Sequence, residues 1–108
     1  MTVVSRGDIW LINLDPTVGN EIKKSRPCVV VSAPEMNKRL HTALVAPMTT
    51  QGSPASFRIP VTHGGKRGLI LLDQIRAIDK SRLIKKLGAL TSKTLNTSLL
   101  TLQETFAL

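Results

Sequence analysis

The side chains best suited to chemistry in this chain are those that can bind and polarise a phosphate. Arg26 precedes a proline at the start of an apolar run, and Thr49 follows a second apolar run. The planar guanidinium of an arginine can hold two phosphate oxygens, and a threonine hydroxyl can donate to a third or orient the phosphate. Two further polar residues, Thr50 and Gln51, follow Thr49 directly. Glu21 adds a carboxylate that could accept a proton.

Each of these residues also has a purely structural interpretation. Arg26 could be tied down at the strand entrance by an ion pair with Asp15 or Asp73. Glu21 could be a solvated carboxylate on a loop, and Thr49 could simply be a polar strand end. Because an arginine stays protonated at any ordinary pH, Glu21 is the first candidate for a general base and Asp73 is the second.

The sequence offers little for other kinds of site. Cys28, His41 and His63 have no recognised metal-ligand spacing, so we expect no metal and no cofactor. Cys28 opens the apolar run 28–31, which favours a buried core residue over a nucleophile. The glycine-rich segment 64–68 lacks the ending and the following helix of a phosphate-binding loop. The two histidines lie in no motif, and we expect both on the surface.

Positive charge dominates the chain and is segregated along it. The formal net charge of +8 attracts polyanions, so nucleic acid is the first partner to consider. Nine basic residues against two acidic ones lie in residues 58–93, and Lys23, Lys24 and Arg26 form a second basic cluster. These two segments could frame one groove along a phosphate backbone, although any single lysine could equally be solvated surface. Aromatic residues make up only 3% of the chain, which argues against binding by base stacking.

Length and composition indicate one globular domain over residues 1–108. A chain of 108 residues can bury a real core. Its 42% of hydrophobic residues exclude a disordered basic tail, and no apolar run is long enough to cross a bilayer. The single cysteine excludes an intramolecular disulfide, and the first residues lack the layout of a signal peptide, so we expect a cytoplasmic location.

Short apolar runs between turn residues predict a mostly β protein. The expected strands cover residues 8–14, 28–32, 42–48, 57–61, 68–72 and 83–90, and residues 75–78 are also mainly apolar. The proline within 57–61 suits an edge strand, and a long charged loop over 17–25 joins the first two strands.

Two helical segments complete the expected elements. Pro34 begins a short helical turn over 34–40. The spacing of Leu95, Leu99, Leu102 and Phe106 predicts one apolar face of a C-terminal helix, with Thr91 or Ser92 as its N-cap. Five to seven short strands and one helix point to a small antiparallel barrel or strongly curved sheet with the helix packed on it.

Three motifs, in this order, resemble the MazF/PemK family of toxin endoribonucleases. Residues 15–21, followed by an Arg-Pro pair and a Val-rich strand, resemble the family's first strand-loop-strand unit. Residues 47–51 are similar to its second motif, and residues 68–74 with Arg76 are similar to its third. The resemblance covers nearly the whole chain, from the opening residues to the final helix.

The resemblance implies an SH3-like barrel of the CcdB/PemK type and a homodimer. It implies sequence-specific, metal-independent cleavage of single-stranded RNA, such as mRNA, and a small acidic MazE-like antitoxin that neutralises the toxin. It transfers a catalytic role to Arg26 and Thr49 and an accessory role to Glu21. Some family members have a catalytic arginine two residues before the third-motif aspartate. This chain has Leu71 there, so no role is transferred.

The chemistry of RNA agrees with what the resemblance implies. RNA carries its own nucleophile, the 2′-OH, so its cleavage to a 2′,3′-cyclic phosphate and a 5′-OH needs only a base, charge stabilisation and help for the leaving oxygen. We expect the RNA to contact Lys23, Lys24, Thr50, Gln51, Asp73, Gln74 and Arg76.

Two other functions remain open. Toxins of the same fold that poison DNA gyrase resemble one another in a C-terminal Trp-Gly-Ile tail, which this chain lacks. A non-catalytic RNA-binding barrel would use Arg26 as a phosphate anchor only.

Overall fold

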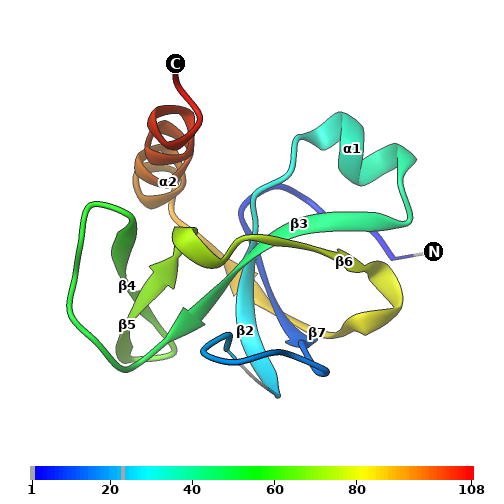
Figure 1. The fold of residues 1–108 in the computed structure, drawn as a ribbon. Coiled ribbons are helices and arrows are strands. Elements are labelled where there is room, and N and C mark those ends of the chain that lie inside the picture. Colours follow the sequence, from blue (N-terminus) through cyan, green and yellow to red (C-terminus); the bar gives the residue numbers. More distant parts are fainter. Residues whose placement is uncertain (1, 23) are drawn as a thin grey trace.

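In the computed structural model, which describes residues 2–22 and 24–108, the strands curl into a single antiparallel half-barrel (Figure 1). Two helices accompany the sheet, α1 (Pro34–Arg39) and α2 (Ser92–Thr105), together with two single 3-10 turns, η1 (Leu72–Gln74) and η2 (Lys80–Arg82). The strands are β1 (Asp8–Asn13), β2 (Ser25–Val30), β3 (Thr42–Thr49), β4 (Arg58–His63), β5 (Lys66–Leu71), β6 (Arg76–Asp79) and β7 (Leu83–Ala89). The predicted mostly β fold with a short helical turn and a C-terminal helix is therefore confirmed. None of the helices in the described residues is long and apolar enough to span a membrane.

Strand β3 joins the two halves of the sheet. The strand order is β4-β5-β3-β2-β1-β7, and β6 pairs with β3 beside this path. The first half of β3 pairs with β6, whereas Met48 and Thr49 at its end pair with Ile70 and Leu69 of β5. The end of β3 thus lies where β2 and the β4–β5 hairpin meet. The proline-containing strand β4 is at the edge, as its sequence predicts.

The Val-rich segment is apolar throughout because both of its faces are buried. Val29 and Val31 pack in one hydrophobic cluster with residues of β3, β4 and β5. Cys28 and Val30 point the other way into a second cluster with Ile12 and residues of β3 and β6. A strand covered on both faces has no polar alternation to show in its sequence. Cys28 is fully buried, which confirms that it is a core residue.

Strand β2 begins three residues earlier than predicted. Ser25, Arg26 and Pro27 pair with Asn13, Ile12 and Leu11 of β1. Ser25 and Arg26 are polar, and the strands were predicted from apolar runs. The sequence therefore shows no signal for this part of β2, where the strand leaves the core. Arg26 consequently lies within β2, where pairing with β1 fixes the direction of its backbone.

Helix α2 packs as expected, except at its end. The Thr91 side chain accepts a hydrogen bond from the backbone N–H of Thr94 at 3.3 Å, which identifies Thr91 as the N-cap. Leu102 packs against the main hydrophobic cluster. Phe106 lines a hollow together with Leu99 and Leu102, as its spacing predicts. It is nevertheless 70% exposed, because it lies just beyond the helix, where the chain projects past the sheet (Figure 1).

Candidate functional site

A pocket of about 290 Å³ brings Arg26 and Thr49 together. The antiparallel register sets Cys28 opposite Pro47, and continuing it by two residues sets Arg26 opposite Thr49. The hairpin of β4 and β5 forms the other wall. We call this the arginine pocket, and its lining residues are Arg26, Pro27, Met48, Thr49, Thr50, Val61, His63, Gly64, Lys66, Arg67 and Gly68.

The arginine pocket has the charge of an anion site. Three of its lining residues, Arg26, Lys66 and Arg67, are cationic and exposed. No aspartate or glutamate of the described residues lines it. Guanidinium groups bind phosphate oxygens through paired, charge-assisted hydrogen bonds. The arrangement therefore suits a phosphate group.

Thr49 is held in place from two sides. Its Oγ1 accepts a hydrogen bond from the backbone N–H of Gln51 at 3.2 Å, which leaves the hydroxyl proton able to point to a ligand. On the other side, a Cβ at Gly68 would lie 2.7 Å from the Thr49 carbonyl oxygen. Strand β5 can approach Thr49 this closely only because residue 68 is a glycine. Thr50 also lines the pocket, whereas Gln51 is exposed outside it.

A second pocket, of about 210 Å³, contains the other candidate site residues. We call it the loop pocket, because the segment between β1 and β2 forms one wall and the segment from η1 to β6 forms the other. Its lining residues are Leu14, Glu21, Ile22, Pro47, Asp73, Gln74, Ile75 and Arg76. Glu21 thus lies in a different pocket from Arg26 and Thr49, so the structure does not gather the three candidate catalytic residues into one cavity.

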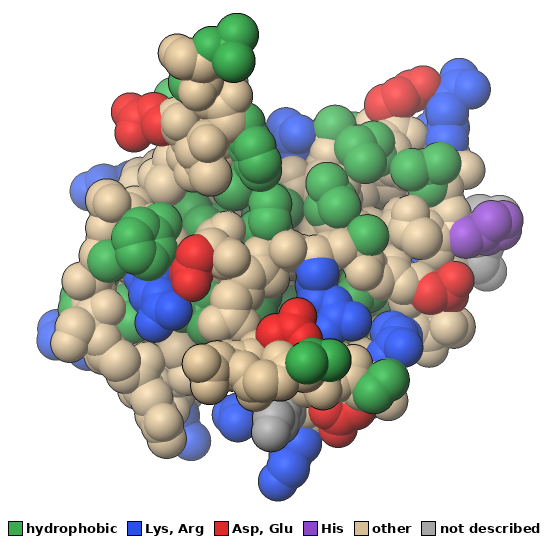
Figure 2. Space-filling view, in the orientation of Figure 1, with side chains coloured by type: hydrophobic (Ala, Val, Ile, Leu, Met, Phe, Trp, Pro, Cys, Tyr) green, Lys and Arg blue, Asp and Glu red, His purple; other side chains and the backbone are tan. Residues whose placement is uncertain are grey.

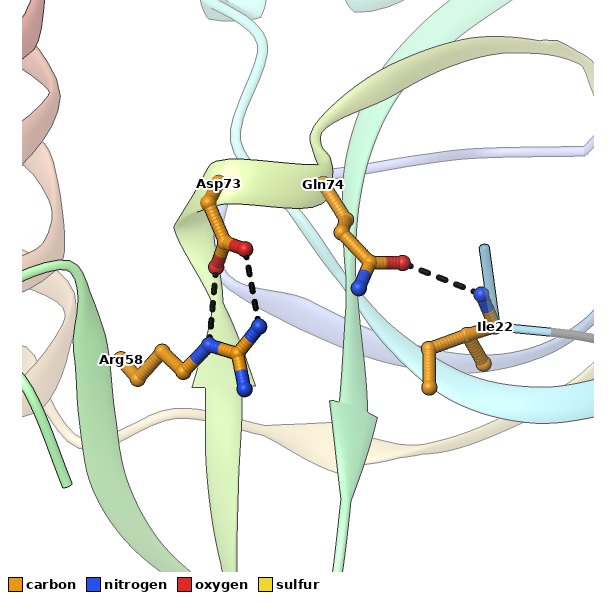
Figure 3. Close-up of polar contacts among 4 residues, drawn as sticks. All are labelled: Ile22, Arg58, Asp73 and Gln74. Atoms are coloured by element: carbon orange, nitrogen blue, oxygen red, sulfur yellow. Dashed lines mark hydrogen bonds and ion pairs between the residues drawn. The ribbon is translucent and has the colours of Figure 1, made fainter. Parts of the chain in front are cut away.

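Side chains from η1 and β6 hold the loop in place. The Gln74 Oε1 accepts a hydrogen bond from the backbone N–H of Ile22 at 3.0 Å (Figure 3). Arg76 Nη1 donates to the carbonyl oxygen of Leu14 at 3.1 Å. Glu21 accepts from the backbone N–H of Val18 at 2.7 Å and so closes a local turn. Its carboxylate is exposed and remains open to solvent and ligands.

Asp73 forms an ion pair with Arg58. The Arg58 Nε and Nη2 donate to the two carboxylate oxygens at 3.2 and 3.0 Å (Figure 3). This pairing raises the pKa of Arg58 above its ordinary value. Both Asp73 oxygens already accept hydrogen bonds, so the structure favours Asp73 as an anchor of η1 over a general base. The other suggested partner of Arg26, Asp15, accepts from the backbone N–H of Lys24 at 2.9 Å.

The basic residues of the loop are only partly described. Lys23 lies outside the described residues. Lys24 is exposed and has a positive φ of 65°. Its carbonyl oxygen accepts from the backbone N–H of Leu14 at 3.0 Å. Its exposed side chain therefore belongs to the segment between the first two strands.

His63 is the residue that sequence reasoning placed wrongly. We expected both histidines on the surface, and His41 is indeed exposed. His63 is half-buried and lines the arginine pocket. Its neighbours Gly64 and Gly65 predict a tight hairpin, so its position at a strand end could have been anticipated. Its place in the same pocket as Arg26 depends on the distant pairing of β5 with β3, for which the sequence has no local signal.

No group of three or more histidine, cysteine, aspartate or glutamate side chains that could hold a metal ion occurs in residues 2–22 and 24–108. Burial raises the pKa of the Cys28 thiol to about 12. A buried thiol that stays protonated is neither a metal ligand nor a nucleophile.

Comparison with known proteins gives a consistent set of matches. The family described as "PemK-like, MazF-like toxin of type II toxin-antitoxin system" matches residues 5–106. Endoribonuclease EndoA of Bacillus subtilis is 38% identical over 91 residues, which are 79% of this chain and 78% of EndoA. Endoribonuclease toxin ChpB of Escherichia coli is 36% identical over 105 residues, 91% of this chain and 90% of ChpB. The crystal structure of MazF from Deinococcus radiodurans has the same fold, with a TM-score of 0.86, 23% identity and complete coverage of both chains.

Proposed function

The chain belongs to the PemK-like, MazF-like toxins of type II toxin-antitoxin systems, and we propose how it works as an endoribonuclease toxin. The substrate is single-stranded RNA, and the nucleophile is the 2′-OH next to the cleaved phosphate. The observation that carries this proposal is the shared, cation-rich pocket of Arg26 and Thr49, which has no carboxylate in the described residues. Such a pocket binds a phosphate and stabilises additional negative charge on it.

Arg26 and Thr49 act on the scissile phosphate. The Arg26 guanidinium holds two non-bridging oxygens, and the Thr49 hydroxyl donates to one of them or orients the group. When the 2′ oxygen attacks phosphorus, charge grows on these oxygens, and the same contacts become stronger. The bond between phosphorus and the 5′ oxygen then breaks. The products are a 2′,3′-cyclic phosphate and a free 5′-OH.

Glu21 is the proposed base, and the loop pocket binds the nucleotides beside the cleaved bond. Pro47 lines the loop pocket and Thr49 lines the arginine pocket, so the two cavities adjoin the same end of β3. The amide group of Gln74 and the guanidinium of Arg76 offer donors for base edges. Lys24, Thr50 and Gln51 extend the path for the RNA backbone. Lys23 and Asp73 belong to the proposed interface as well.

RNA cleavage in the presence of EDTA tests this function. We expect the chain to cut single-stranded RNA with the metal chelated, and to leave 2′,3′-cyclic phosphate and 5′-OH ends. A substrate with a single 2′-deoxy nucleotide at the cleaved position should bind but stay intact. Cleavage of that substrate, or loss of activity in EDTA, would contradict the proposed chemistry. Binding without any cleavage would favour the non-catalytic alternative.

We propose a small acidic antitoxin and a second copy of the chain as partners. Solved structures of similar fold include MazE-MazF from Deinococcus radiodurans, with a TM-score of 0.80 and 21% identity. A net charge of +8 suits an acidic partner. Hydrophobic side chains gather on the face between α2 and α1 (Figure 2), over a hollow lined in part by Leu99, Leu102 and Phe106. Such a surface supports a dimer interface. We place the toxin in the cytoplasm, where mRNA is translated.

A further inference from the structure

The position of His63 in the arginine pocket is restricted by the elements around it. It is the last residue of β4 and pairs with Lys66 across the two-residue turn of Gly64 and Gly65. One edge of its ring is close to β7, because a Cβ added to Gly88 would lie 3.5 Å from the His63 Cε1. A tight hairpin on one side and the backbone of β7 on another restrict where the imidazole can point. The ring is half-buried and lines the same cavity as Arg26 and Thr49.

The leaving oxygen needs a proton donor, and His63 is the side chain of the pocket best suited to supply one. An alkoxide leaves phosphorus slowly unless a proton reaches it. Ammonium and guanidinium groups can donate a proton but are weaker acids than an imidazolium, and hydroxyl groups such as those of threonine are far weaker still. A histidine ordinarily titrates at about pH 6.5, so it can both give up a proton and regain it from water. Among the described lining residues, His63 is the histidine.

His63 lies in a different pocket from the proposed base. In an in-line displacement at phosphorus, the attacking and leaving oxygens lie on opposite sides. The proposed base, Glu21, lies in the loop pocket, and His63 lies in the arginine pocket on the hairpin side. Arg26 and Thr49 line the arginine pocket at the ends of β2 and β3.

We propose that His63 is the general acid of RNA cleavage, an inference that rests on the proposed function. The proton of the 2′-OH passes to the base as the bond between the 2′ oxygen and phosphorus forms. The bond from phosphorus to the 5′ oxygen breaks, the electron pair stays on that oxygen, and the oxygen takes the proton of the His63 imidazolium. Water then returns a proton to the imidazole.

The charged groups near His63 are compatible with this role. Lys66 and Arg67 of β5 and Arg26 of β2 line the same pocket as His63. On β7, Gly88 lies beside the ring and brings no charge. A bound phosphate adds negative charge among these cations, and this favours the protonated imidazole that an acid requires. The substrate thus helps to prepare the acid.

The test compares His63→Ala on two substrates that differ in one atom. The first is a normal RNA, and the second has sulfur in place of the 5′ oxygen at the cleaved bond. A thiolate leaves without protonation because thiols ionise near neutral pH. We expect the His63→Ala variant to cleave normal RNA roughly 10²–10⁴-fold more slowly than the wild-type chain. The same variant should cleave the sulfur substrate at close to the wild-type rate. The basic limb of the pH–rate profile should disappear for the wild-type chain on the sulfur substrate.

Two matched variants make the result specific. Arg26→Ala should be slow on both substrates, because both need the phosphate clamp. His41→Ala removes the other histidine, which is exposed and outside the pocket, and should match the wild-type rate on both. Circular dichroism should show that all three variants fold. If His63→Ala does not fold, His63→Gln replaces it in the same comparison.

The possible outcomes separate this inference from the proposed function. An equal loss on both substrates would show that His63 positions or binds the RNA, and a normal rate on ordinary RNA would show that it is not needed. Either result overturns the role as an acid while cleavage by the wild-type chain upholds the proposed function. A wild-type chain that cuts neither substrate overturns both.

Discussion

Residues of β2 that stabilise the fold lie close in sequence to a residue that faces solvent at the arginine pocket. Arg26 pairs through its backbone with Ile12 of β1, and its side chain is exposed. Cys28, two residues further along β2, is completely buried. The backbone of one strand therefore changes from a binding surface to a core within two residues.

Replacing Arg26 should therefore affect catalysis much more than folding. We expect Arg26→Ala to lower the rate of RNA cleavage by at least about 10²-fold, since it removes a contact that strengthens in the transition state. The free energy of unfolding should change by only about 0.5 kcal/mol, as is usual for exposed positions. Arg26→Lys keeps the charge but loses the paired donors, so its cleavage rate should lie between those of the wild-type chain and Arg26→Ala. An unfolded Arg26→Ala chain by circular dichroism would mean that Arg26 is structural.

The buried thiol gives a prediction on pH. Burial raises the pKa of Cys28 to about 12, so the native state keeps the proton that the unfolded chain loses from about pH 9 upward. The stability contributed by the protonated thiol is complete below that pH and declines as pH rises towards 12. Iodoacetamide should therefore label native Cys28 very slowly and label it readily in denaturant. Denaturation curves of Cys28→Ala should lack this part of the alkaline decline. Rapid labelling of the native chain would contradict the buried position.

At the level of elements, a glycine sets the spacing between β5 and β3. Gly68 faces the Thr49 carbonyl oxygen so closely that a methyl group would need to lie 2.7 Å from it. The two atoms cannot share that space, so either β5 moves outward or Thr49 shifts. Both movements change the wall of the arginine pocket.

Gly68→Ala should consequently damage the site through the backbone. We expect a loss of stability of about 1–3 kcal/mol, as for other overpacked positions, together with slower RNA cleavage. Gly65→Asn is the matched control, because this turn residue has open space around it and asparagine tolerates a positive φ. Thermal melting and cleavage rates of both variants provide the measurement. Normal cleavage by Gly68→Ala would mean that Thr49 does not depend on this contact.

The elements themselves were largely predictable, because their signals are local. Apolar runs, turn residues and the helical spacing of Leu95, Leu99 and Leu102 identify the strands and α2. The start of β2 was missed since its exposed residues are polar, and β6 was left unassigned because it is only four residues long. Phe106 lines one hollow with Leu99 and Leu102, as its spacing predicts, but it lies just beyond the helix and is 70% exposed.

The arrangement of the site was less predictable, because it depends on contacts between distant segments. Residues 26 and 49 were paired by their resemblance to known motifs, and they do share a pocket. The same resemblance grouped Glu21 with them, but the hydrogen bond from the Ile22 backbone N–H to Gln74 helps hold the Glu21 segment in the neighbouring loop pocket (Figure 3). Two side-chain contacts, made across more than fifty residues of sequence, are invisible to any local pattern.

At the level of the whole molecule, charge and shape favour ligands that are both long and acidic. Lys24 after β1 and the basic residues of β5 and of segment 76–86 lie outside the core. The hydrophobic residues between α1 and α2 form a separate surface (Figure 2). RNA and an acidic antitoxin would therefore compete for the same cations, whereas a second copy of the chain would use the apolar surface.

This competition predicts the effect of reversing charge in the loop. We expect Lys24→Glu, and more strongly Lys23→Glu with Lys24→Glu, to slow antitoxin association and to weaken RNA binding together, because both ligands are attracted by the same field. The association rate of the wild-type chain should fall steeply as salt is added, and the slope should be smaller for the variants. Lys38→Glu, an equal charge change on exposed α1, should have a much weaker effect on both ligands. If the loop variants weaken RNA binding but leave antitoxin association at low salt unchanged, the two ligands do not share this loop, and the antitoxin must block the toxin from another surface.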